Sequence, residues 1–119
     1  MTKSEYNENF KIYYNKVKFA SPEEQYQQII IFVRYLIDGY EEKHINISDV
    51  GAWVASIWLA SNCNQFGNQQ VLEIITDLGM KGNFFDQGEK RVKEEWGISY
   101  EEAESKYISQ LKELLIMAA

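Results

Sequence analysis

The sequence is poor in the side chains that most often do chemistry. Its 119 residues include one cysteine (Cys63), one histidine (His44), one proline (Pro22) and two arginines. A single cysteine cannot form an intrachain disulfide, so nothing in the sequence requires an oxidising compartment. A transition-metal site gathers several imidazole or thiolate ligands, and this chain has one of each, nineteen residues apart. The sequence therefore predicts no metal site and no cofactor.

Candidates for catalysis are equally few. Cys63 and His44 form the only thiol–imidazole pair, and no motif or third group that would orient the histidine accompanies them. A lone cysteine is more often a small buried hydrophobe than a nucleophile. Carboxylates remain for acid–base work, at residues 23–24, 94–95 and 101–104, but they lie among charged residues on faces that look exposed. We therefore expect no enzymatic activity.

Long apolar segments are also missing. The first eight residues are polar and contain no signal-like apolar stretch. The longest apolar candidate, residues 50–60, is far shorter than the roughly 18 residues that read as membrane-spanning. The sequence predicts a cytoplasmic protein with no membrane segment.

Positive charge is scarce relative to negative charge. Eighteen acids against twelve bases give a formal net charge of −6. The acid excess is larger in the second half, where residues 61–119 hold ten acids and six bases, against eight and six in residues 1–60. This sign opposes phosphate backbones, so we expect no nucleic-acid binding. It favours a basic protein partner through electrostatic steering, although acidity also serves solubility alone.

What is present points to helices in one domain over residues 1–119. Hydrophobic residues make up 45% of the chain, too many for a disordered segment. Ser21 and Pro22 suit the N-cap and first position of a helix, and Glu24 completes a capping box. Apolar residues then recur at spacings of three and four as far as Tyr40. This pattern predicts a central helix over residues 22–43 with neighbours on several sides.

Similar signals predict the other helices. One begins at a cap near Ser48 and carries two tryptophans, and another covers residues 68–78 and ends at Gly79. Residues 79–88, with three glycines, predict a loop. A short helix follows over residues 89–96, and a last one runs from the Ser99 capping box to about residue 117. Residues 6–19 fit a helix better than a strand. The fold class predicted is all-α, a compact single-domain bundle of about five to seven helices.

Two kinds of residue are candidates for contact with a partner. Aromatic side chains beside acids have the composition of a binding hot spot. The predicted anchors are Tyr14, Phe84 and Phe85. Phe84 and Phe85 have a competing interpretation as a plug folded over the core, since adjacent exposed phenylalanines are costly. The predicted charged contacts are Glu41, Glu42, Asp86, Glu94, Glu95, Glu101 and Glu102.

In size, acidity and helix content the chain resembles the small bacterial immunity proteins that neutralise colicin-type toxins or the toxin domains of contact-dependent growth inhibition. The resemblance covers the whole chain as a profile, and no functional residue is carried over by position. It implies a cytoplasmic inhibitor that binds a basic toxin domain, such as a nuclease, in a stoichiometric complex.

Two alternatives stay open. One is a helical adaptor or regulatory subunit, including a phage-encoded inhibitor, that binds a protein through an apolar groove. The other is an enzyme that uses carboxylates, with Glu94 or Glu102 in a cleft; a deep pocket holding two acids of raised pKa would favour it.

Overall fold

Six helices make up the part of the protein that the structure describes. The computed structural model describes residues 2–61 and 69–117, and for residues 69–72 the backbone alone. The helices are α1 (Lys3–Lys18), α2 (Pro22–Glu41), α3 (Ile47–Ser61), α4 (Gln69–Gln87), α5 (Glu89–Trp96) and α6 (Tyr100–Met117). The described residues contain no strand, so the all-α prediction is confirmed, as is the helix expected over residues 6–19. Within these ranges, no helix combines the length and apolar character needed to cross a membrane.

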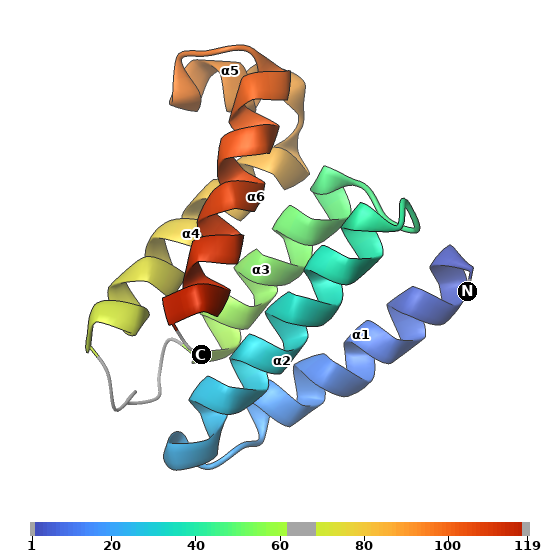
Figure 1. Ribbon diagram of the computed structural model, residues 1–119, viewed down its shortest axis with the longest axis vertical. Helices are drawn as coiled ribbons and strands as arrows, with labels where there is room; N and C mark the ends of the chain where they lie inside the picture. Colours follow the sequence, from blue (N-terminus) through green and yellow to red (C-terminus); the bar gives the residue numbers. More distant parts are fainter. Residues whose placement is uncertain (1, 62–68, 118–119) are drawn as a thin grey trace.

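Helix α2 packs against several neighbours, as the width of its apolar face predicts, but it is not the central helix. Helix α3 exposes only Leu59, whereas Ile31, Arg34 and Asp38 leave one side of α2 open. Figure 1 shows α1, α2 and α3 side by side, with α6 crossing over α4 and short α5 at the end where α4 finishes and α6 begins. Helix α2 contacts α1, α3 and α6. Ile29, Phe32, Val33 and Leu36 are completely buried along it, so its apolar residues are covered from more than one side.

Helix ends follow local sequence rules in most places. Ser99 accepts a hydrogen bond from the Glu102 backbone N–H at 3.2 Å and donates to the Glu102 carboxylate at 3.3 Å, which is the predicted capping box. Gly97 ends α5 with a left-handed φ of 68°. Ser21 and Pro22 start α2 as expected, but the Ser21 side chain makes no capping hydrogen bond. The position of that helix start is therefore confirmed and its capping box is not.

The predicted cap of α3 is wrong by two residues. The helix starts at Ile47, and the reciprocal pair that caps it is formed by Asn46 and Asp49. Each of these side chains accepts a hydrogen bond from the backbone N–H of the other residue, at 3.0 and 3.1 Å. The Ser48 hydroxyl instead donates to the Phe85 carbonyl on α4, at 3.2 Å. The serine chosen as a local cap thus serves a tertiary contact.

The loop predicted over residues 79–88 is also wrong, because α4 continues to Gln87. Gly79 and Gly82 lie inside the helix, where it passes close to α3. A Cβ at Gly82 would lie 2.5 Å from the Gly51 carbonyl oxygen of α3, and a Cβ at Gly51 would meet the Gly82 carbonyl in return. A Cβ at Gly79 would meet the ring of Trp58. These glycines allow two helix backbones to touch, which a sequence pattern alone does not distinguish from a helix end.

Helix α2 ends with a strained lysine. The His44 N–H bonds to the Gly39 carbonyl at 2.9 Å and the Lys43 N–H to the Tyr40 carbonyl at 3.0 Å, the paired bonds of a Schellman motif. Lys43 occupies the left-handed position that glycine usually takes, with φ of 64°. An L-residue with a Cβ costs about 1 kcal/mol in this conformation.

Replacing this lysine is expected to stabilise the protein. Lys43→Gly should raise the free energy of unfolding by about 0.5–1 kcal/mol, because glycine reaches the left-handed region without steric cost. Urea denaturation monitored by circular dichroism measures the change. Lys43→Ala is the matched control: it removes the same charge and keeps the Cβ, so it should give no comparable gain. Equal gains from both variants would show that the charge, and not the backbone, limits stability here.

Candidate functional site

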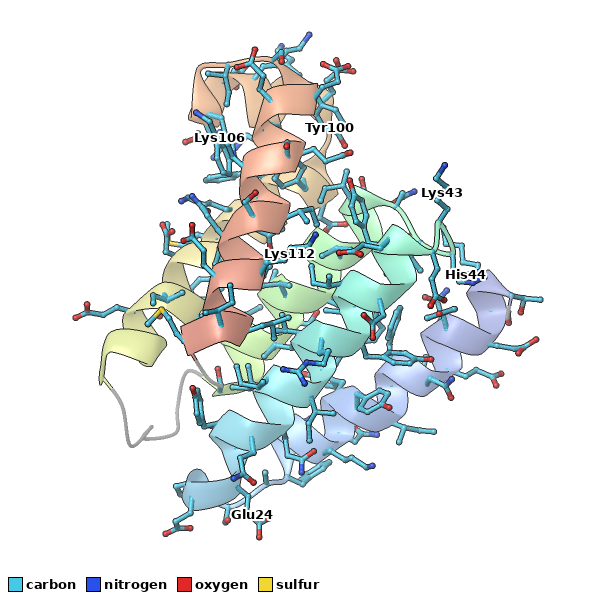
Figure 2. All side chains as sticks on the ribbon, viewed as in Figure 1. Glu24, Lys43, His44, Tyr100, Lys106 and Lys112 are labelled. Carbon is cyan, nitrogen blue, oxygen red and sulfur yellow. The ribbon has the colours of Figure 1, made fainter. Side chains whose placement is uncertain are left out.

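Two of the predicted charged contacts, Glu41 and Glu42, lie at the end of α2, and the structure gives both of them partners. Glu41 forms an ion pair with Lys112 of α6 at 2.7 Å. Figure 2 shows Lys112 between α6 and α2. Glu42 accepts a hydrogen bond from the Tyr6 hydroxyl at 3.3 Å and lies 3.4 Å from Nε2 of His44. Both glutamates are exposed, but each helps to join α2 to a neighbouring segment.

The other five predicted acids gather at the end of the molecule formed by α5, the last turn of α4 and the first turn of α6 (Figure 1). All five are exposed: Asp86, Glu94, Glu95, Glu101 and Glu102. We call these five residues the acidic end. Glu95 pairs with Arg91 at 3.1 Å, and Glu102 takes part in the Ser99 cap. Among the described residues, Asp86, Glu94 and Glu101 take part in no ion pair, although Lys90 and Lys93 line one shallow hollow with Glu94. Residues 86–102 hold six acids and three bases, so this end keeps an excess of negative charge.

The three predicted aromatic anchors differ in exposure. Phe85 is completely buried, so its prediction as an exposed anchor is wrong and the alternative of a core plug is correct for it. Phe84 is half-buried, with the Arg91 guanidinium 5.2 Å from its ring centroid. Tyr14 is half-buried and packs on Trp53, with ring centroids 6.0 Å apart. Of the three, Phe84 alone combines exposed surface with a position beside the acidic end, on the same helix as Asp86.

A polar hollow of about 550 Å³ lies where α1 and α3 begin and α2 ends. Its wall carries both signs of charge, with Lys3 and Lys43 against Glu41 and Asp49. Lys3 and Asp49 form an ion pair at 3.4 Å across it. Figure 2 shows Lys43 and His44 at this end of α2, near the start of α1. Because its wall carries two lysines and two carboxylates, the hollow has no strong preference for one sign of ligand.

A second hollow, of about 420 Å³, is a groove between α4 and α6. Apolar side chains and carboxylates from both helices line it. The lining residues are Glu73, Ile74, Asp77, Leu78, Gln110, Glu113, Leu114 and Met117. We call this hollow the α4/α6 groove. No sequence signal indicates that α4 and α6 leave a groove between them.

Tyrosine hydroxyls tie the helices around these sites together. Tyr40 of α2 donates to the Glu104 carboxylate of α6 at 2.8 Å. Burial, and then this carboxylate, raise the pKa of Tyr40 to about 12. Tyr107 of α6 donates to the Leu78 carbonyl of α4 at 3.0 Å, and its burial raises the pKa of its hydroxyl. Both hydroxyls are therefore neutral donors at physiological pH, and they hold α6 against α2 and α4.

Catalytic constellations find little support in the geometry. Within the described part of the chain, no three His, Cys, Asp or Glu side chains converge closely enough to hold a metal ion. Glu94 and Glu102, the acids considered for a carboxylate enzyme, are exposed on α5 and α6. Cys63 lies outside the described residues. No protein-family model, no curated protein and no solved structure matches this chain.

Proposed function

We propose that this protein is a cytoplasmic inhibitor that binds a basic protein domain in a stoichiometric complex, as toxin-immunity proteins do. The observation that carries the proposal is the acidic end, where Asp86, Glu94 and Glu101 are exposed and make no ion pair among the described residues. The preferred partner is a basic toxin domain such as a nuclease.

The physical argument rests on the excess of acids over bases at this end of the molecule. Carboxylates that already pair with lysine or arginine contribute little field at a distance, whereas unpaired ones on adjacent helix ends add their potentials. Such a field accelerates encounter with a positively charged surface and falls off with salt. A nuclease must present lysine and arginine to its phosphate substrate, so its cleft has the matching charge. An acidic end seated there would also block the substrate.

Affinity capture with salt as a variable tests this proposal. The tagged protein should capture one basic partner at equal stoichiometry from an extract of the source organism, and moderate salt should release it. The double variant Glu94→Lys/Glu101→Lys should slow association with that partner by about tenfold or more at low salt, because it reverses two of the steering charges.

The matched control reverses two exposed acids elsewhere. Glu8→Lys/Glu23→Lys changes the net charge from −6 by the same four units. Like the test pair, it includes one acid within a helix and one in a first turn, on α1 and α2. It should slow association much less. Equal effects of the two double variants, or tight capture that salt does not weaken, would contradict docking through the acidic end.

The α4/α6 groove favours a second candidate function, a helical adaptor that binds its partner mainly through apolar contacts. Its floor of leucine, isoleucine and methionine side chains is the supporting observation. Capture that resists salt, together with association of the chain with itself, would favour this alternative.

A further inference from the structure

We infer that the α4/α6 groove binds an amphipathic helix that carries lysine or arginine beside its apolar residues. This inference rests on the proposed function insofar as such a helix belongs to the basic partner. The groove is a separate surface from the acidic end. Its lining residues lie in the N-terminal half of α4 and the C-terminal half of α6, whereas the acidic end is formed by the opposite ends of these two helices and by α5.

The floor of the groove is apolar. Leu78 and Leu114 are almost completely buried, and they form its base. Ile74 is half-buried beside them, and Met117 is 45% exposed. Methionine adapts its shape to different partners because it is unbranched and flexible. A floor of this kind binds aliphatic side chains of a partner.

Both rims of the groove carry negative charge. Glu73 and Asp77 stand on α4 and Glu113 on α6. Asp77 is paired with Lys81 at 2.8 Å. Glu73 and Glu113 are exposed, and among the described residues neither takes part in an ion pair. Apolar residues flanked by basic ones on a ligand would therefore meet an apolar floor and carboxylates on each side.

The length of the groove suits a helix. Beside the lining residue Gln110, Lys81 of α4 bonds through its Nζ to Oε1 of Gln110 at 3.2 Å and lies 5.1 Å from the ring centroid of Trp96. From Gln110 to Met117 the floor follows α6 for about 10 Å, at 1.5 Å per residue, or roughly two helical turns. Two parallel ridges of side chains with a depression between them accept a third helix by ordinary ridge-into-groove packing. The ligand would place two or three apolar side chains there at i, i+3 and i+7.

Charge decides between the occupants of this groove. A second copy of the chain, docked by a two-fold axis, would bring the same acidic rims against each other. A nucleic acid would bring phosphates against them. A basic amphipathic helix gains from the rims as well as from the floor, so it is the occupant we commit to.

A designed peptide tests the inference directly. The probe is an 18-residue peptide of leucine and lysine, with leucine at helical spacing and a fluorophore at its N-terminus. The control is a scrambled peptide of identical composition. In fluorescence anisotropy at about 0.15 M salt, which screens attraction to acids outside the groove, the amphipathic peptide should bind the full chain at least about tenfold more tightly than the scrambled one, because only the first presents a continuous apolar face.

Variants localise the binding. The variant Glu73→Lys/Glu113→Lys should bind the amphipathic peptide about tenfold more weakly. The two other double variants, Glu94→Lys/Glu101→Lys and Glu8→Lys/Glu23→Lys, have the same net charge and should change the affinity for the peptide by less than about twofold. Met117→Ser should weaken binding by about fivefold through lost apolar contact. Met80→Ser is its matched control, because Met80 has a similar exposure of 49% and does not line the groove. In a protein with ¹³C-labelled methionine methyls, the signal of Met117 should shift on binding and that of Met80 should not.

The outcomes separate this inference from the proposed function. Equal affinity of the protein for both peptides would overturn the groove as a helix site. So would an equal loss of affinity for the amphipathic peptide in all three charge-reversed double variants. A dimer of the chain that Met117→Ser dissociates, without peptide binding, would assign the groove to self-association and also overturn it. If a captured basic partner still binds the Glu73→Lys/Glu113→Lys variant normally, the inhibitor function stands and the groove inference fails. If the peptide binds as described but no basic partner is captured, the groove inference stands and the inhibitor function fails.

Discussion

Gly82→Ala is expected to lower the free energy of unfolding by about 3 kcal/mol, at the upper end of the usual cost of overpacking. The new Cβ would lie 2.5 Å from the Gly51 carbonyl oxygen and 2.6 Å from the Tyr107 hydroxyl. The first of these is backbone in the second turn of α3, so α3 and α4 would have to separate. The Tyr107 hydroxyl would also have to leave its hydrogen bond to Leu78. Urea unfolding with a constant m-value measures the loss.

The matched control for this variant is Gly39→Ala. Both glycines are buried inside a helix, and alanine improves helix propensity at each site by about 1 kcal/mol. At Gly39 the nearest atom to a Cβ is Cε1 of Tyr6, at 2.9 Å, which belongs to a side chain and not to backbone. The Tyr6 ring can shift, so we expect a loss well below that of Gly82→Ala. A mild effect of Gly82→Ala would show that α3 and α4 are not in backbone contact.

Phe85→Ala is expected to cost about 4 kcal/mol, within the range for removing a buried phenylalanine side chain. Phe85 is completely buried where three helices meet. Its ring centroid lies 5.0 Å from that of Tyr107, 5.8 Å from that of Tyr100 and 6.2 Å from that of Trp96. Its removal leaves a cavity among large aromatic rings that cannot collapse easily. Chemical denaturation followed by tryptophan fluorescence reports the change, since Trp96 is one of the ring neighbours.

The neighbouring residue supplies the control. Phe84 has the same side chain and the same helix, but it is half-buried under the Arg91 guanidinium. Phe84→Ala should cost about 1 kcal/mol, typical of a partly exposed position. It should also be the variant of the two that affects capture of a partner, because Phe84 has exposed surface near the acidic end. Similar losses of stability from both variants would contradict the buried placement of Phe85.

Local signals in the sequence are sufficient for most helix ends and helix faces, although the Ser21 side chain makes no capping hydrogen bond. The Ser99 capping box and the Gly97 helix end involve atoms within a few residues of each other, and both form as predicted. The three-and-four spacing of apolar residues likewise identified α2 and α6, because a helix repeats the same face at that interval.

The errors came where a residue serves a distant element. Gly79 and Gly82 carry the same local signal as a helix terminator, but they permit close contact between α3 and α4. Ser48 has the composition of a cap, but its hydroxyl bonds to α4. Adjacent phenylalanines in the sequence suggest one shared role for Phe84 and Phe85. Successive residues of a helix point about 100° apart, however, and only Phe85 faces the core.

The candidate sites likewise depend partly on the sequence alone and partly on the tertiary structure. The sequence by itself determined the acid excess, the shortage of catalytic side chains and the helices, since these depend on composition and local spacing. Only the tertiary structure decided which acids are paired, that five of them share one end, and that α4 and α6 leave an apolar groove with acidic rims. Glu73 and Glu113 are forty residues apart in the chain. They line one groove because the packing of α6 on α4 brings them together, and no local pattern encodes that packing.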